Sequence, residues 1–111
     1  MSPSALSKVR SLMLSLATGE PGPCSTMARR QLEHPADLQR GWLAVETCRV
    51  LGVPEPAAVA WGAACELLHS ASLVHRDIQD GEHLRRGRPT LWVQHGAPQA
   101  INVGDLLLAL P

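Results

Sequence analysis

The chain has 111 residues, of which 45% are hydrophobic, and its ten basic and ten acidic side chains give a formal net charge of zero. This length accommodates one small domain and leaves little room for a deep substrate cavity. The neutral balance gives no global electrostatic reason to expect a nucleic acid or an anionic membrane as partner. Three Trp make up the whole aromatic content, so a core must be built from Leu, Val and Ala.

The cysteines and the N-terminus bear on the cellular compartment. Cys24, Cys48 and Cys65 are odd in number, widely spaced and without a C-x-x-C pair. A disulfide framework or structural zinc site is therefore not expected, and a reducing cytoplasm is the predicted location. The apolar stretch at 11–17 is too short for a membrane span and lacks a clear cleavage site, which leaves a secretory peptide only as an alternative.

The first third of the chain predicts two short helices. Residues 4–18 fit an amphipathic helix imperfectly, and the Gly/Pro-rich segment 19–23 breaks regular structure. We therefore interpret residues 1–24 as a weakly structured helix and linker that precede a domain over 25–111. Ser25 or Thr26 is expected to cap a helix over about 27–33, which Pro35 closes.

Three more helices are predicted, at 37–51, from about 57 to 80, and from near Pro98 to residue 110. The longest is interrupted by Glu66 and His69, so we interpret it as buried in protein rather than as a membrane span. Residues 81–88 are expected to form a polar loop. Four to five helices without a strand pattern predict an all-α fold. The last predicted helix is apolar over residues 106–110, which indicates that this helical fold is incomplete.

Ionisable side chains follow one face of the long predicted helix. At 100° per residue, Glu66, His69, Arg76, Asp77 and Asp80 fall within a narrow arc on an otherwise apolar helix. Such charges are costly unless they face a wet cavity or bind something. An arginine cluster follows directly. Carboxylates suit Mg²⁺ and guanidinium forks match phosphate oxygens, so the order predicts a metal-binding edge beside a diphosphate clamp.

Three linked motifs carry a resemblance. They are ELLHSASLVHRDIQDG at 66–81, LRRGRPT at 84–90 and QAINVGD at 99–105. The set closely resembles the trans-isoprenyl diphosphate synthases, the polyprenyl synthetase family, in which a helix ending in D-D-x-x-D is followed by R-R-G-x-P-T and Q-A-x-x-x-G-D. The match is continuous over about 27–111. It implies that 25–111 is the N-terminal part, about a third, of an isoprenoid-synthase-type helical bundle.

The resemblance implies a head-to-tail prenyltransferase of isoprenoid biosynthesis. In such an enzyme Mg²⁺ assists departure of the diphosphate from an allylic substrate, isopentenyl diphosphate attacks the allylic cation, and a proton is lost. Carried over residue by residue, the implied roles are metal binding by Asp77 and Asp80, contact with the allylic diphosphate by Arg85, and contact with isopentenyl diphosphate by Arg40, His69 and Arg86.

The chain departs from the family pattern at two motif positions. Arg76 stands at the first aspartate of D-D-x-x-D, and Asp37 replaces the lysine of G-K-x-x-R. Magnesium affinity is expected to fall, because a positive charge replaces a ligand. Arg76 can pair with Asp80, four residues on, or hold a diphosphate directly in place of one metal.

The family's second aspartate-rich motif has no counterpart in these 111 residues. We therefore expect the isolated chain to be inactive in prenyl transfer. The alternative is a non-catalytic helical subunit that pairs with a separate synthase chain. The small residues at 70–72 mildly favour a long product channel, but the product length is left open.

Three simpler interpretations compete for the same residues. Asp77 and Asp80 could be a solvated helix end with intrahelical ion pairs. A zinc set of His69, His75 and Asp77 does not fit, because the three do not share one helix face. A nucleic-acid patch at 85–88 would need more basic surface and more stacking aromatics than this sequence has.

Overall fold

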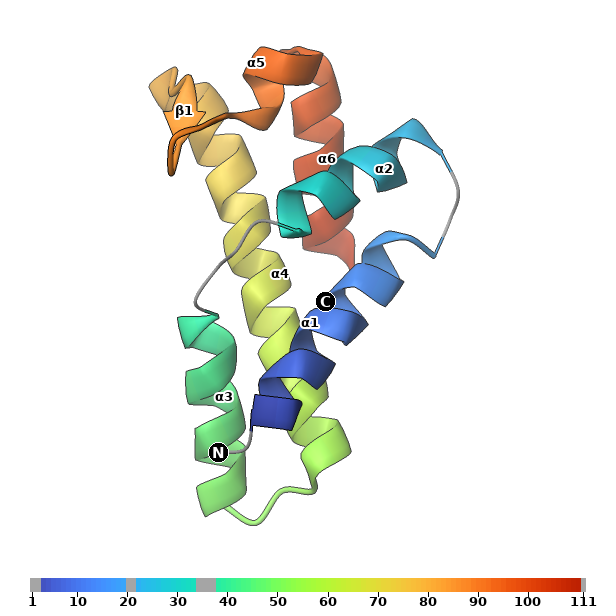
Figure 1. Cartoon of the computed structure of the whole chain (residues 1–111), viewed down its shortest axis with the longest axis vertical. Helices are drawn as coiled ribbons and strands as arrows, with labels where there is room; N and C mark the ends of the chain where they lie inside the picture. Colours follow the sequence, from blue (N-terminus) through green and yellow to red (C-terminus); the bar gives the residue numbers. More distant parts are fainter. Residues whose placement is uncertain (1–2, 20–21, 34–37, 111) are drawn as a thin grey trace.

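The protein is described by a computed structural model that covers residues 3–19, 22–33 and 38–110 (Figure 1). The described residues form six helices and one pair of two-residue strands. In chain order these are α1 (Pro3–Ala17), α2 (Pro23–Leu32), α3 (Gln39–Val50), α4 (Glu55–Asp80), β1 (Leu84–Arg85), β2 (Arg88–Pro89), α5 (Leu91–His95) and α6 (Ala97–Ala109). The predicted all-α fold is confirmed, while the strand pair and α5 were not expected.

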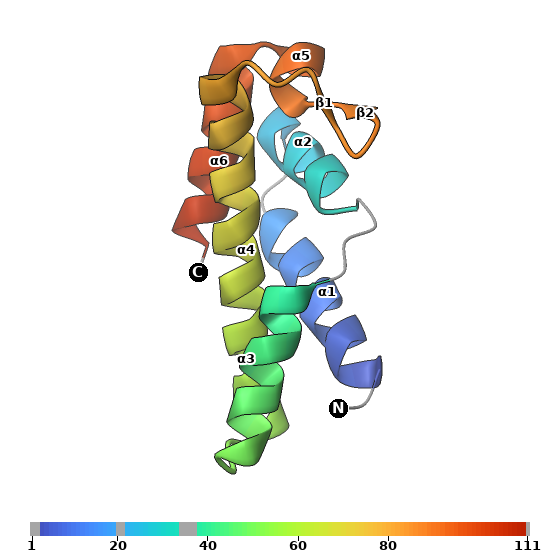
Figure 2. The same cartoon turned by 90° about the vertical axis from the view of Figure 1, so that its left-hand side faces the viewer.

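Helix α4 organises the structure. It contacts α1, α3 and α6, and Figure 1 shows α3 along one half of its length and α6 along the other. Helices α1 and α2 follow one another on one side of α4 (Figure 2). By length and composition α4 could cross a membrane, yet its apolar face packs against the neighbouring helices. The fully buried side chains are aliphatic, as the composition predicts, and include Val9, Leu67, Val74, Val103 and Leu107.

Two glycines let α3 and α4 approach closely. A Cβ added at Gly62 would lie 3.1 Å from Val45 and Val9 and 3.2 Å from the carbonyl of Gly41. A Cβ at Gly41 would lie 3.1 Å from Cγ of Glu66. The crossing therefore depends on the absence of side chains at both positions, and it brings the start of α3 against Glu66.

The first two helices differ in detail from their predictions. Helix α1 is regular, and Val9 and Met13 on its inner face are buried. Helix α2 begins at Pro23, because proline is favoured in the first helical turn. The hydroxyl of Thr26 is not an N-cap, since it donates to the carbonyl of Gly22 one turn earlier. Pro35, the predicted end of this helix, and Asp37, the predicted start of the next, lie outside the described residues.

The expected polar loop after α4 is instead a β-hairpin. Leu84 pairs with Pro89 and Arg85 with Arg88, in antiparallel register. The two residues between the strands, Arg86 (φ 53°) and Gly87 (φ 77°), both have positive φ, which is the backbone of a tight hairpin turn that matches strand twist. The sequence did not predict the strands because Arg-Gly lacks the usual Asn-Gly or Asp-Gly signal.

Candidate functional site

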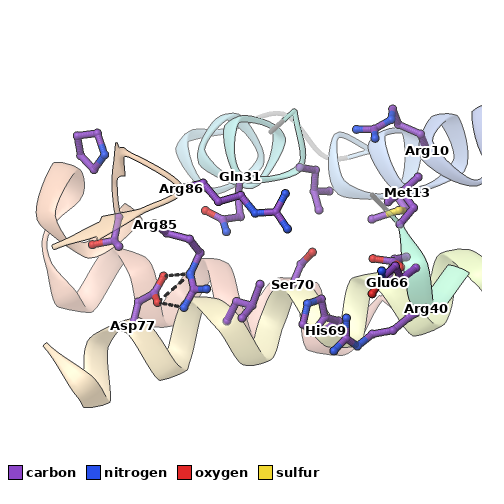
Figure 3. A pocket seen from close by; sticks show the side chains of 16 residues that line it. Arg10, Met13, Gln31, Arg40, Glu66, His69, Ser70, Asp77, Arg85 and Arg86 are labelled. Atoms are coloured by element: carbon purple, nitrogen blue, oxygen red, sulfur yellow. Dashed lines mark hydrogen bonds and ion pairs between the residues drawn. The ribbon is translucent and has the colours of Figure 1, made fainter. Parts of the chain in front are cut away.

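A cavity of about 270 Å³ lies between α4, the start of α3, the inner faces of α1 and α2, and the hairpin (Figure 3). Helix α4 forms its floor through side chains at 66, 69, 70, 73 and 77, a spacing that places them in one row. Four arginines from three other elements also line it: Arg10 on α1, Arg40 on α3, and Arg85 and Arg86 on the hairpin. The cavity is therefore rich in positive charge, although the whole chain is neutral.

Arg85 and Asp77 form the principal ion pair of the cavity. Nε of Arg85 lies 3.0 and 3.1 Å from the two carboxylate oxygens of Asp77, and Nη2 lies 2.5 Å from Oδ1. The Asp77 side chain is 5% exposed and that of Arg85 is 35% exposed. The hydrogen bonds to Asp77 raise the pKa of Arg85 above its ordinary value, so the guanidinium stays charged. Both oxygens of the buried carboxylate are thus engaged by a permanent cation.

Arg76 and Asp80 lie outside the cavity lining. Their side chains are 72% and 51% exposed, and Nε of Arg76 is 3.4 Å from Oδ2 of Asp80. The predicted intrahelical pair is therefore confirmed, and Arg76 is not placed to hold an anion in this cavity. The polar residues predicted to share one face of α4 are divided between two surroundings. Glu66, His69 and Asp77 face the cavity, whereas Arg76 and Asp80 face solvent.

The carboxylates described here do not fit a divalent cation. Asp77 is bound by Arg85, and Asp80 is paired with Arg76. Glu66, also buried, accepts a 2.7 Å hydrogen bond from the backbone N–H of Gly41. Over residues 3–19, 22–33 and 38–110, no three His, Cys, Asp or Glu side chains are grouped. In this conformation Mg²⁺ could use Asp77 or Asp80 only if the carboxylate left its arginine.

Hydrogen bonds from Thr90 and Trp92 tie the residues after the hairpin to the segment that follows α4. Oγ1 of Thr90 and Nε1 of Trp92 both donate to the carbonyl of Glu82, at 2.8 and 2.7 Å. The N–H of Thr90 donates to the carbonyl of His83, whose ring packs against Trp92 with centroids 5.3 Å apart. Thr90 and Trp92 therefore hold the returning strand, and with it Arg86, over the cavity. The sequence analysis did not assign this role to either residue.

Most of the predicted site residues are brought together. Arg40, His69, Asp77, Arg85 and Arg86 all line the cavity, although they come from three different elements, α3, α4 and the hairpin. His75 does not belong to it, because its Nε2 lies 3.3 Å from Oδ1 of Asp105 on α6.

Arg10 and Gln31 also line the cavity, and the sequence analysis missed both. The sequence could have indicated Arg10, because it follows Val9 directly and precedes Met13 by about one helical turn. Both of these apolar residues are buried on the inner face of α1.

Residues 23–111 match the sequence profile of the family described as polyprenyl synthetase. The chain belongs to the polyprenyl synthetase family. It is 34% identical to a chloroplastic geranylgeranyl pyrophosphate synthase of Arabidopsis thaliana over 101 residues, which are 89% of this chain and 28% of that protein. It is 56% identical to the geranylgeranyl diphosphate synthase of Sulfolobus acidocaldarius over 48 residues, 43% of this chain and 14% of that one.

Solved structures agree with this polyprenyl synthetase assignment. The geranylgeranyl pyrophosphate synthetase of the archaeon Geoglobus acetivorans superposes with a TM-score of 0.86 and 30% identity. The superposition covers 96% of this chain but 35% of that one. This polyprenyl synthetase chain therefore has the isoprenoid-synthase helical fold and spans about a third of the length of that neighbour.

Proposed function

We propose that the chain forms the diphosphate-binding wall of an isoprenyl diphosphate synthase cavity and that it serves isoprenoid biosynthesis. The reaction of such a cavity is prenyl transfer from an allylic diphosphate to isopentenyl diphosphate. The observation that carries the proposal is the convergence of Arg40, His69, Arg85 and Arg86 on one cavity. These residues come from the motifs that resemble the family, and a diphosphate is the ligand class that several arginines recognise.

Within this wall the residues divide by position. Arg40, His69 and Arg86 are proposed to bind isopentenyl diphosphate, and Arg85 is proposed to contact the allylic diphosphate. Arg40 directly precedes Gly41, whose N–H is held by Glu66, so the start of α3 is fixed relative to α4. Guanidinium groups held on separate rigid elements can grip a diphosphate from several sides without a large loss of side-chain freedom.

The 111-residue chain by itself is proposed not to elongate a prenyl chain. The magnesium implied by the family resemblance does not fit the described carboxylates, since Asp77 and Asp80 both pair with arginines. The proposal therefore gives a metal no role in the departure of the diphosphate from this chain's cavity. The compartment, a reducing cytoplasm, stays a prediction.

A second candidate is a non-catalytic helical subunit that pairs with a separate synthase chain. The observation in its favour is an exposed apolar row on α4, where Trp61 and Leu68 lie seven residues apart and thus on one face. Trp61 is 64% exposed. A large exposed apolar surface is typical of an interface. Co-purification with a full-length synthase would support this candidate, whereas a monodisperse monomer that binds no synthase would count against it.

Calorimetric titration of the chain with isopentenyl diphosphate tests the main proposal. We expect binding that Arg40→Gln weakens about tenfold, because a charge-assisted contact contributes on the order of 1.5 kcal/mol or more. Arg49→Gln is the matched control, since Arg49 lies on the same helix but pairs with Glu46 away from the cavity. Equal loss in both variants, or no binding by the parent chain, would contradict the proposal. A separate assay with both diphosphates should show no chain elongation.

A further inference from the structure

The charges of the cavity bear on how it can hold a diphosphate. Its lining contains four arginines but only two carboxylates, Glu66 and Asp77. Glu66 is engaged by the N–H of Gly41, and both oxygens of Asp77 are engaged by Arg85. The carboxylates are therefore already held by protein groups, and the lining keeps an excess of positive charge.

We propose that this cavity binds a diphosphate through arginines alone, without a divalent cation, and that Arg10 of α1 is one of the binding residues. The inference rests on the proposed function and deepens it. Arg85 occupies the carboxylate of Asp77 that a metal would otherwise use. A guanidinium is a permanent cation with a planar fork of donors, so it can bind phosphate oxygens at any ordinary pH.

Arg10 extends the arginine set to α1, a helix that the profile match does not include. It lines the cavity from α1, whereas the match begins at residue 23. Figure 3 shows Arg10 and Met13 on the wall formed by α1, on the opposite side of the cavity from Arg40 and His69. The sequence has Asp37 where the family pattern has a lysine, and Arg10 supplies a positive charge to the cavity from a different segment. Arg10, Arg85 and Arg86 already have polar contacts in the protein, so the anion would exchange with some of these contacts.

The location of Arg76 is part of the same inference. Its side chain is exposed and paired with Asp80 outside the cavity lining, so it does not contribute to the arginine set. The carboxylate of Asp80 is likewise directed to a guanidinium rather than to the cavity. Both aspartates of the motif are thus paired with an arginine, and the buried Arg85–Asp77 pair is the one that occupies a carboxylate in the cavity.

The experiment is calorimetric titration of the full chain with inorganic pyrophosphate, once with EDTA and once with excess Mg²⁺. We expect binding in EDTA and no tighter binding in Mg²⁺, since magnesium complexation lowers the charge of the ligand. Binding that is at least tenfold tighter in Mg²⁺ would overturn this inference while leaving the proposed diphosphate wall intact. Absence of binding under both conditions would overturn both.

A variant pair tests the part played by Arg10. Arg10→Gln should weaken pyrophosphate binding in EDTA about tenfold, the effect of losing one charge-assisted contact. Lys8→Gln is the matched control, because Lys8 lies on the same helix but pairs with Glu55 at 3.2 Å, outside the cavity lining. Equal affinities of the two variants would contradict the role of Arg10. Circular dichroism checks that both variants keep the helical content of the parent chain.

Discussion

Arg85 holds the buried carboxylate of Asp77 by contacts from two of its nitrogens to both oxygens. Removing one partner of such a pair leaves a charge without compensation. We expect Asp77→Ala to lower the free energy of unfolding by about 2 to 3 kcal/mol, less than for a fully buried pair because Arg85 is partly exposed. Urea denaturation measures this change. The double variant Asp77→Ala/Arg85→Ala should lose less than the sum of the single variants.

The Arg76–Asp80 pair provides the contrasting case. Both side chains are more than half exposed, and exposed pairs contribute little because water and salt screen them. Asp80→Ala should therefore change the free energy of unfolding by at most about 0.5 kcal/mol in the same urea experiment. A loss as large as that of Asp77→Ala would show that Asp80 has a structural role that its exposure does not indicate.

Arg76→Asp should raise the affinity for a divalent cation above that of the parent chain. The change frees Asp80 from its partner and adds a carboxylate one helical turn before it, so two oxygen ligands share a face. Binding of Mn²⁺, followed by electron paramagnetic resonance, should rise at least tenfold. Arg76→Gln removes the cation without adding a ligand and should show a smaller gain. If Arg76→Asp gains no metal affinity, the substitution at position 76 is not what prevents metal binding.

Gly104→Ala should weaken the contact between α4 and α6. A Cβ at this position would overlap the imidazole ring of His75, which lies over the glycine and is 3.3 Å from Asp105. The ring must rotate away from its contact with Asp105, at a cost of about 1 to 3 kcal/mol, of which the higher helix propensity of Ala offsets about 1 kcal/mol. Thermal unfolding measures the loss. His75→Ala in the same chain should recover part of it by removing the overlap, and an unchanged melting temperature for Gly104→Ala would contradict the close approach of the two helices.

Cys24 should react slowly with alkylating reagents in the folded chain. Burial raises the pKa of its thiol above the ordinary value of 9.0, so the reactive thiolate is scarcer at a given pH. In a Cys48→Ser/Cys65→Ser chain, alkylation by iodoacetamide at pH 8 should be faster in urea than in buffer. As pH rises, the thiol ionises at a lower pH in the unfolded chain than in the folded one. The contribution of Cys24 to the free energy of unfolding therefore falls as pH rises through 9.0. An equal rate in both states would show that Cys24 is not protected.

The sequence determined the helical class of the fold and the chemical character of the site. Apolar residues at helical spacing, with Gly and Pro between segments, gave the order of the long helices, because these patterns follow from backbone geometry within one segment. The motif intervals indicated the family and the arginines after α4. The pairing of Arg76 with Asp80 could also be predicted, since both lie on one helix four residues apart.

Only the tertiary structure decided which charges from different elements meet. Asp77 and Arg85 are eight residues apart, and their pairing depends on a hairpin whose turn places Arg86 and Gly87 at positive φ, a conformation that Arg-Gly does not signal. Arg10 reaches the cavity because α1 packs against α4, a contact that no local pattern encodes. The hairpin therefore decided that Asp77 is held by Arg85, and helix packing decided which arginines line the cavity beside this pair.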